Sequence, residues 1–312
     1  MSFVILVTAR SFKELPGKHH QILQDLDCEV RWNPYDRPLR EDELLDLLNG
    51  VDGMIAGQDE ITRKVIEYAN RLKVISKHGV GVDNIDLSAA KARGIIVCNT
   101  PGTNSISVAE LAIAFIFVLS RSIVTQDCNA KAGLWKRVMG EEITGSSLGI
   151  IGLGRIGKEV SKRARCLEMN VLVFDSYFDK EFANKFNIAY AGLDELLIKS
   201  NYISLHVPLT AETKNLLNRE KLQLISSSSY LINTARSELV DEKALYDLLK
   251  EKKIAGAGLD VISANSLLLT LDNVIATPHI GGCTTTAIEN TGIIAAQNIV
   301  NVLQQKEPLY RV

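Results

Sequence analysis

The sequence predicts an α/β fold built from two doubly wound parallel sheets, in a chain of 312 residues. Short apolar runs alternate with amphipathic helical segments, which is the βαβ rhythm of a parallel sheet. The rhythm occurs in two series, separated by the turn-rich segment Thr100-Pro-Gly-Thr-Asn-Ser. With 46% hydrophobic residues, the chain can bury enough apolar surface for two domains.

The first series starts at the amino-terminal apolar run. Strands are expected over Phe3–Thr8, Cys28–Arg31, Gly53–Ala56, Val74–Ser76 and Ile95–Cys98, with helices such as Arg40–Leu48 and Thr62–Asn70 between them. The first seven residues carry no charged leader and no small-residue cleavage site, so they predict a strand and a cytoplasmic location. The pair His19-His20 lies in a polar stretch, which we interpret as a solvated loop.

The second series follows a predicted buried helix. Ser107-Val-Ala-Glu110 has the pattern of a capping box and opens the apolar run through Leu119. The run Leu111–Leu119 is much shorter than the roughly 20 residues of a membrane span, so no membrane partner is expected. The expected elements are strands over Gly149–Ile151, Val171–Phe174, Tyr202–Leu205, Tyr230–Asn233, Ala255–Leu259 and Val274–Ala276, then a helix over Thr285–Leu303.

Charge and cysteine usage argue against several classes of function. The formal net charge is −2, and glutamates interrupt the basic residues Lys158, Lys162 and Arg165, so a solvated helix face is favoured over a nucleic-acid surface. The five cysteines share no C-x-x-C spacing. We therefore predict neither a disulfide framework nor a metal site.

The segment from Leu148 to Asp175 has the pattern of a dinucleotide site. Gly152-Leu-Gly154-Arg155-Ile156-Gly157 stands between an apolar run and a helical segment, and the next apolar run ends at Asp175. The three glycines allow a tight turn, close approach of a pyrophosphate and close helix packing. A carboxylate at Asp175 binds free ribose hydroxyls and repels a 2′-phosphate, so the predicted cofactor is NAD.

Further motifs along the chain resemble the D-isomer-specific 2-hydroxyacid dehydrogenase family, and its phosphoglycerate dehydrogenase-like branch in particular. They are Lys77-His-Gly-Val-Gly-Val-Asp-Asn84, Asn99 to Leu111, His206-Val-Pro-Leu-Thr210, Leu231-Ile-Asn-Thr-Ala-Arg236, Gly258-Leu-Asp260 and Thr277-Pro-His-Ile-Gly-Gly282. The resemblance implies a flavodoxin-like substrate domain from residues 1–98 with 281–312. It also implies a Rossmann-like NAD domain from residues 99–280, and a homodimer.

The resemblance also implies the catalytic roles. Arg236 would hold the substrate carboxylate, for which a planar guanidinium is suited. His279 would give the proton to the substrate oxygen, because imidazole changes protonation state near neutrality. The backbone N–H groups of Val80 and Gly81 would complete the carboxylate pocket.

The cofactor contacts implied by the family extend beyond the glycine loop. His206, Val207 and Pro208 would pass the adenosine side, and Thr234 and Ala235 the nicotinamide side. Asp260 would accept a hydrogen bond from the carboxamide of the cofactor. The remaining implied contacts are His279, Gly281 and Gly282.

Asn265 is the main departure from the family pattern. The family has a glutamate there, which pairs with the histidine and raises its pKa, whereas an amide supplies no charge. Asn265 would hold the catalytic position of that glutamate. A second departure is Gly57-Gln-Asp-Glu60, where phosphoglycerate enzymes have a basic phosphate contact.

Two hypotheses follow. The first is an NAD-dependent enzyme that interconverts a 2-oxo acid and a D-2-hydroxy acid, with 3-phosphoglycerate and phosphohydroxypyruvate among the candidate substrates. The second is an NAD-binding regulatory or binding protein with weakened catalysis, because nucleotide binding requires nothing of Asn265.

Overall fold

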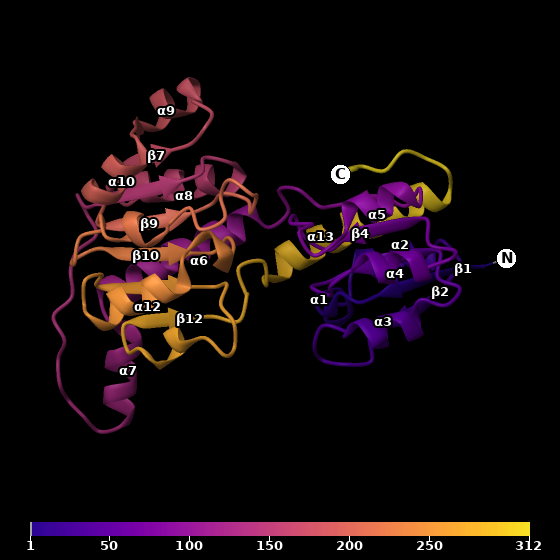
Figure 1. Ribbon diagram of the computed structural model, residues 1–312, viewed down its shortest axis with the longest axis horizontal. Helices are drawn as coiled ribbons and strands as arrows, with labels where there is room; N and C mark the ends of the chain where they lie inside the picture. Colours follow the sequence, from indigo (N-terminus) through magenta and orange to yellow (C-terminus); the bar gives the residue numbers. More distant parts are fainter. Residues whose placement is uncertain (1) are drawn as a thin grey trace. The chain divides into compact units, whose positions relative to one another are not determined.

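The computed structural model describes residues 2–312 and divides the chain into two compact units (Figure 1). Unit 1 runs to Asn104 and takes in Gly282–Val312, while unit 2 is Ser105–Gly281. The predicted boundaries, after residues 98 and 280, fall slightly earlier. Each unit contains one sheet whose strands are all parallel, so the predicted fold class is confirmed.

Unit 1 has a five-stranded sheet in the order β2-β1-β3-β4-β5. Its strands are β1 (Phe3–Val7), β2 (Cys28–Trp32), β3 (Gly53–Ala56), β4 (Val74–Lys77) and β5 (Ile96–Cys98).

Helices cover both faces of this sheet, because alternate apolar side chains of each strand point to opposite faces. One face packs against α3 (Glu41–Leu47), α4 (Arg63–Tyr68) and α5 (Leu87–Ala92). The other face packs against α1 (Arg10–Glu14), α2 (Lys18–Gln24) and α13 (Thr285–Leu303).

The interpretation of His19-His20 as a solvated loop is wrong. Both residues lie in α2, and His19 is 0% exposed. A Cβ on Gly292 of α13 would lie 2.7 Å from Cγ of His19, so the missing side chain of this glycine makes room for the imidazole. The local sequence pattern does not indicate this burial, because Gly292 is distant in the chain.

Unit 2 has a seven-stranded sheet in the order β12-β11-β10-β9-β6-β7-β8. Its strands are β6 (Ser147–Ile151), β7 (Asn170–Phe174), β8 (Ala189–Tyr190), β9 (Tyr202–Leu205), β10 (Tyr230–Asn233), β11 (Gly256–Leu259) and β12 (Val274–Ala276). The chain moves outward from β6 to β8 and then returns to place β9 on the other side of β6. The carboxyl ends of β6 and β9 therefore form the switch point at which open α/β sheets bind ligands.

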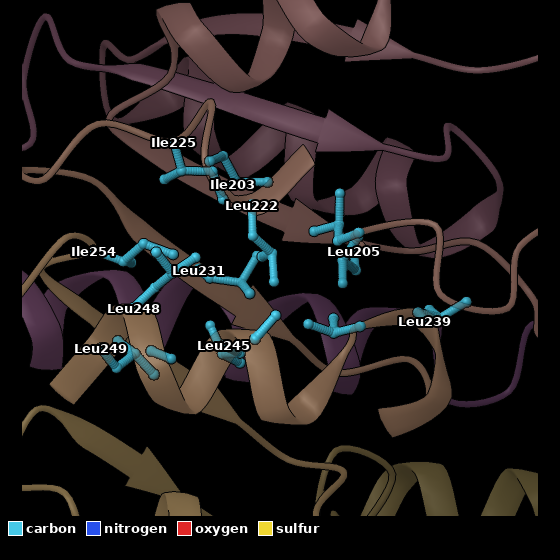
Figure 2. Close-up of a cluster of buried hydrophobic side chains, with 14 of the residues drawn as sticks. Ile203, Leu205, Leu222, Ile225, Leu231, Leu239, Leu245, Leu248, Leu249 and Ile254 are labelled. Carbon is cyan, nitrogen blue, oxygen red and sulfur yellow. The ribbon is translucent and has the colours of Figure 1, made fainter. Parts of the chain in front are cut away.

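Two apolar clusters hold the helices of unit 2 against its sheet. One joins the sheet to α6 (Ser105–Ser120) and α8 (Arg155–Cys166). The other, shown in Figure 2, joins it to α10 (Leu193–Lys199), α11 (Arg219–Leu222) and α12 (Glu242–Lys250). The other helices of the unit are α7 (Ile123–Lys131), α9 (Lys180–Phe186), η1 (Ser237–Leu239) and η2 (Leu267–Thr270).

The start of α6 corrects one sequence prediction. The helix begins at Ser105, so Ser107 lies inside its first turn and is not the capping residue. Within residues 2–312, no single helix is long and apolar enough to cross a membrane. Only α6 and α7 taken together reach that length and hydropathy, and the chain bends by 61° between them.

Candidate active site

The glycine loop of unit 2 lies at the switch point, between β6 and the start of α8. Gly152 has a φ of +97°, which a side chain would strain, and a Cβ there would lie 2.7 Å from the carbonyl oxygen of His206. A Cβ at Gly157 would collide with the carbonyl oxygen of Gly152. The first and third glycines are therefore required by the fold of the loop itself.

Gly154 differs from the other two glycines, because no atom lies within 4 Å of the position of its missing Cβ. It is the N-cap of α8, and Arg155 and Ile156 form the first turn. The N–H groups of a first helical turn have no partners within the helix and carry partial positive charge. This open, electropositive position fits a pyrophosphate.

Asp175 follows the last residue of β7 and is fixed from two sides. Its Oδ2 accepts a hydrogen bond from the N–H of Leu153 at 2.6 Å, and its Oδ1 accepts one from the N–H of Tyr177 at 2.8 Å. Oδ2 has a second lone pair, and that of Oδ1 is engaged only by a long bond from the Ser176 hydroxyl at 3.5 Å, so ribose hydroxyls can still donate to the group. The residues present fit NAD.

Two buried polar atoms without partners lie at the ends of β9 and β10, which are neighbours in the sheet. Nδ1 of His206 and Oγ1 of Thr234 are buried and have no hydrogen-bond partner within residues 2–312. Nε2 of His206 is 2.8 Å from Oγ of Ser204, and burial lowers the pKa of His206 to about 3. The imidazole is therefore neutral at physiological pH. Val207, Pro208 and Ala235 follow the same strand ends.

Asn233 fixes the turn that carries Arg236. Its Nδ2 donates to the carbonyl oxygen of Arg236 at 2.7 Å, and its Oδ1 accepts from the N–H of Ala235 at 3.0 Å. The guanidinium Nη1 of Arg236 also donates to the carbonyl oxygen of Ala235 at 2.7 Å. Asn233 is only 2% exposed and was not predicted as a site residue, although it lies in the quoted motif.

Asp260 fixes the segment that carries His279. Its Oδ1 accepts from the hydroxyl of Thr277 at 2.6 Å and from the N–H of Ile280 at 2.7 Å. Its Oδ2 accepts from the N–H of Gly281 at 2.8 Å. These three bonds leave one lone pair, on Oδ2, for the predicted carboxamide contact, which stays a prediction.

His279 has a left-handed backbone conformation, with φ of +57°, and its side chain is exposed. Its N–H donates to the carbonyl oxygen of Asp260 at 2.9 Å. Left-handed backbone in a residue other than glycine costs about 1 kcal/mol, and such strain persists where surrounding bonds enforce it. The bonds of Asp260 on both sides of His279 provide this enforcement.

Asn265 lies in the exposed loop between β11 and η2. Its backbone N–H donates to Oγ of Ser263 at 3.4 Å. The next residue, Ser266, is buried, and its hydroxyl donates to Glu242 of α12 at 2.8 Å. The loop is therefore anchored to α12 directly after Asn265, while Asn265 itself faces solvent.

In unit 1, Val80 and Gly81 belong to the loop that follows β4. The N–H of Gly79 donates to Oγ1 of Thr100 at 3.1 Å, and the side chain of Asn99 donates to the carbonyl oxygen of Val80 at 2.9 Å. These bonds tie the loop to the segment after β5. Gly282, the first residue of the return to unit 1, lies near the Asn104 side chain.

Comparison with known proteins assigns the family. The family model of the D-isomer specific 2-hydroxyacid dehydrogenase NAD binding domain matches residues 113–281. The chain belongs to this family, and residues 113–281 are its NAD-binding domain.

Three relatives show how far the likeness extends. A D-3-phosphoglycerate dehydrogenase of Methanocaldococcus jannaschii is 44% identical over 85% of this chain and 52% of its own length. A glyoxylate reductase of Pyrococcus horikoshii is 36% identical over 92% of this chain and 90% of its own length. A crystal structure of a Thermus thermophilus protein superposes with a TM-score of 0.90 at 36% identity, covering 99% of this chain and all of that one. The chain thus spans about half the length of the curated phosphoglycerate dehydrogenases it matches.

Proposed function

We propose that this protein is an NAD-dependent dehydrogenase that interconverts a 2-oxo acid and the corresponding D-2-hydroxy acid. The observation that carries the proposal is that Arg236 and His279 lie on segments that are fixed at the same edge of the sheet. Asn233 fixes the first segment and Asp260 fixes the second, as described above. The N–H of Asp260 donates to the carbonyl oxygen of Asn233 at 2.9 Å, so the two segments are tied at adjacent strand ends.

Each side chain has one task in this proposal. NADH, when bound, supplies the hydride that reduces the 2-oxo carbon. Arg236 binds the substrate carboxylate through two parallel N–H bonds and orients the carbonyl group. His279 donates a proton to the carbonyl oxygen in reduction, and in the reverse direction it accepts the hydroxyl proton. The N–H groups of Val80 and Gly81 are proposed to bind the carboxylate as well.

We propose a small unphosphorylated 2-oxo acid as the substrate, with glyoxylate as a candidate and phosphohydroxypyruvate as the alternative. The segment that carries a basic phosphate contact in phosphoglycerate enzymes contains Asp59 here. Asp59 is 1% exposed and accepts hydrogen bonds from the hydroxyl of Thr8 and, at 2.8 Å, from the N–H of Leu39. The segment Gly57-Gln-Asp-Glu60 therefore offers no basic side chain to a phosphate.

The alternative function is NAD-dependent regulation or binding with weakened catalysis. Asn265 favours it, because an exposed amide gives no charge with which to stabilise a protonated His279. Nucleotide binding is independent of this residue, so the alternative predicts NADH binding without turnover.

We further propose that the protein is a homodimer, with a cytoplasmic location as the sequence predicts. Large apolar side chains are exposed along α7 and the segment after it, which extend away from the sheet of unit 2 (Figure 1). Trp135 is 89% exposed and Met139 is 96% exposed. Large exposed apolar side chains are typical of an interface, and a second copy would bury them symmetrically. Sedimentation of the wild type and of Trp135→Glu tests this, because a sedimentation coefficient of the monomer for both would refute the dimer.

The test of the activity is NADH consumption with a panel of glyoxylate, pyruvate, hydroxypyruvate and phosphohydroxypyruvate. Arg236→Lys should retain NADH binding and lose roughly 2 kcal/mol or more of transition-state stabilisation on the best substrate. Arg219→Lys is the matched control, since Arg219 is an exposed arginine of unit 2 that pairs with Asp247. No turnover on any 2-oxo acid together with micromolar NADH binding would favour the regulatory alternative.

A further inference from the structure

Three of the five histidines of the chain gather at one corner of unit 1, around Phe12. Nε2 of His19 lies 3.1 Å from the carbonyl oxygen of Phe12, and Nε2 of His20 lies 2.8 Å from the same oxygen. A carbonyl oxygen only accepts, so both Nε2 atoms carry their proton. The two ring centroids are 4.5 Å apart, which places both imidazoles within reach of strong mutual repulsion if each becomes charged.

His78 joins this cluster from the sheet, at the end of β4. Its ring meets the Phe12 ring edge to face at a centroid distance of 5.8 Å, and its Nδ1 is 3.4 Å from Oγ of Ser11. Nε2 of His78 and Nδ1 of His19 are buried without hydrogen-bond partners within residues 2–312. A second proton on either ring would therefore add a poorly solvated charge to the cluster.

His78 directly precedes the loop of the proposed carboxylate contacts. Its own N–H donates to the carbonyl oxygen of Ala56 at 2.9 Å, and the next residue, Gly79, is bound to Thr100. On one side of Gly79 the chain is held by the packed His78 ring, and on the other side Asn99 binds the carbonyl oxygen of Val80. The direction in which the N–H groups of the loop point is thus set from both ends.

We propose that His78 is a positioning residue: its neutral ring, packed into the histidine cluster, fixes the Gly79–Gly81 loop, and protonation of the cluster releases the loop and weakens binding of the 2-oxo acid. This inference rests on the proposed function for the role of the loop. The loop belongs to unit 1 and the NAD loop to unit 2, so acid should affect the two ligands differently.

Burial and nearby charges favour the neutral forms of the His78 and His19 rings. Burial is the main cause that lowers the pKa of His78 to about 4, with help from nearby His19 and Lys77 and against an opposing effect of the Ile288 backbone. The pKa of His19 is lowered mainly by burial, and also by His20. Glu289 of α13 is the acidic group that opposes the shift of His19, together with backbone carbonyl groups. His78 and His19 are therefore neutral at neutral pH, and His78 gains a second proton only as the pH falls toward about 4.

The experiment compares the KM of the best 2-oxo acid with kcat and NADH affinity between about pH 7 and pH 4. In the wild type, KM should stay nearly constant down to about pH 5 and then rise about twofold as the pH reaches about 4, the pKa of His78, while the NADH Kd stays constant. His78→Phe keeps an aromatic ring that cannot titrate, so its KM should lose this pH dependence. His78→Ala removes the packing and should raise KM at every pH with a smaller change in kcat. An equal rise of KM toward acid in the wild type and in His78→Phe would overturn the proposal.

Two measurements stand apart from activity, so a failure of the proposed function can be told from a failure of this inference. Histidine ¹⁵N resonances should show His78 neutral to near pH 4, and hydrogen exchange of the peptide 77–84 should be faster in His78→Ala than in the wild type. A His78 that titrates near pH 6.5, or unchanged exchange of that peptide in His78→Ala, would refute the inference even if no substrate is found.

Discussion

Acid should destabilise unit 2 through His206. Its pKa in the fold is lowered to about 3 by burial, against about 6.5 in an unfolded chain. Above pH 6.5 the imidazole is neutral in both the folded and the unfolded chain, so the contribution of this group to the free energy of unfolding is constant. That contribution is lost as the pH falls from 6.5 toward 3. At about pH 4.5 the unfolded chain has gained a proton that the folded chain has not. The difference of about two pH units times 1.36 kcal/mol predicts a loss of about 2.7 kcal/mol.

Hydrogen exchange of the peptides that cover β9 and β10 measures this loss in unit 2 alone. His206→Asn cannot titrate, so on going from pH 7 to about pH 4.5 it should lose about 100-fold less protection than the wild type. Carboxylates contribute equally to both proteins and cancel in the comparison. Ser204→Ala, which keeps the imidazole and removes its hydrogen bond, should retain the pH dependence of the wild type. Equal pH dependence in the wild type and in His206→Asn would refute the burial argument.

Three further predictions concern the NAD loop and the proton donor. Gly157→Ala should abolish NADH binding and destabilise unit 2 by about 3 kcal/mol, because its Cβ collides with backbone; a folded variant with the wild-type Kd would contradict this. Asp175→Ala should reduce the preference for NADH over NADPH about tenfold or more, and fluorescence titration with both cofactors would show an unchanged ratio if the residue has no such role. Asn265→Glu should extend reductase activity to higher pH provided that the new carboxylate reaches the ring of His279, because its charge then raises the pKa of the proton donor; identical alkaline limbs in the two pH–rate profiles would show that residue 265 does not act on the histidine.

The NAD loop could be predicted from the sequence because its constraints are local. Gly152 and Gly157 are required by contacts within the strand-turn-helix unit, and Asp175 follows the next strand in the chain. The one constraint on this loop that depends on the order of the sheet is the position of His206, whose carbonyl oxygen lies against Gly152. Local geometry of this kind is encoded in the spacing of a few residues.

The histidine cluster could not be predicted, because its contacts are distant in sequence. In the sequence His19 is a polar residue among polar neighbours, whereas its burial depends on Phe12 and on the space left by Gly292. The capping residue of α6 was misplaced for a related reason. A capping-box pattern shows only where a helix can begin locally, and in the structure α6 begins earlier, at Ser105.

Asn233 and Asp260 explain why two loop residues can act with the precision of a rigid element. Both are almost fully buried at the carboxyl ends of neighbouring strands, and the backbone hydrogen bond between them continues the ladder of β10 and β11. From this fixed edge, one side chain holds the turn of Arg236 and the other holds both sides of His279. Catalytic groups need positions fixed to within about 0.5 Å, which a solvated loop does not provide. The strain at His279 and the burial of two polar side chains are therefore best understood as the cost of fixing the proposed carboxylate anchor and proton donor to one sheet edge.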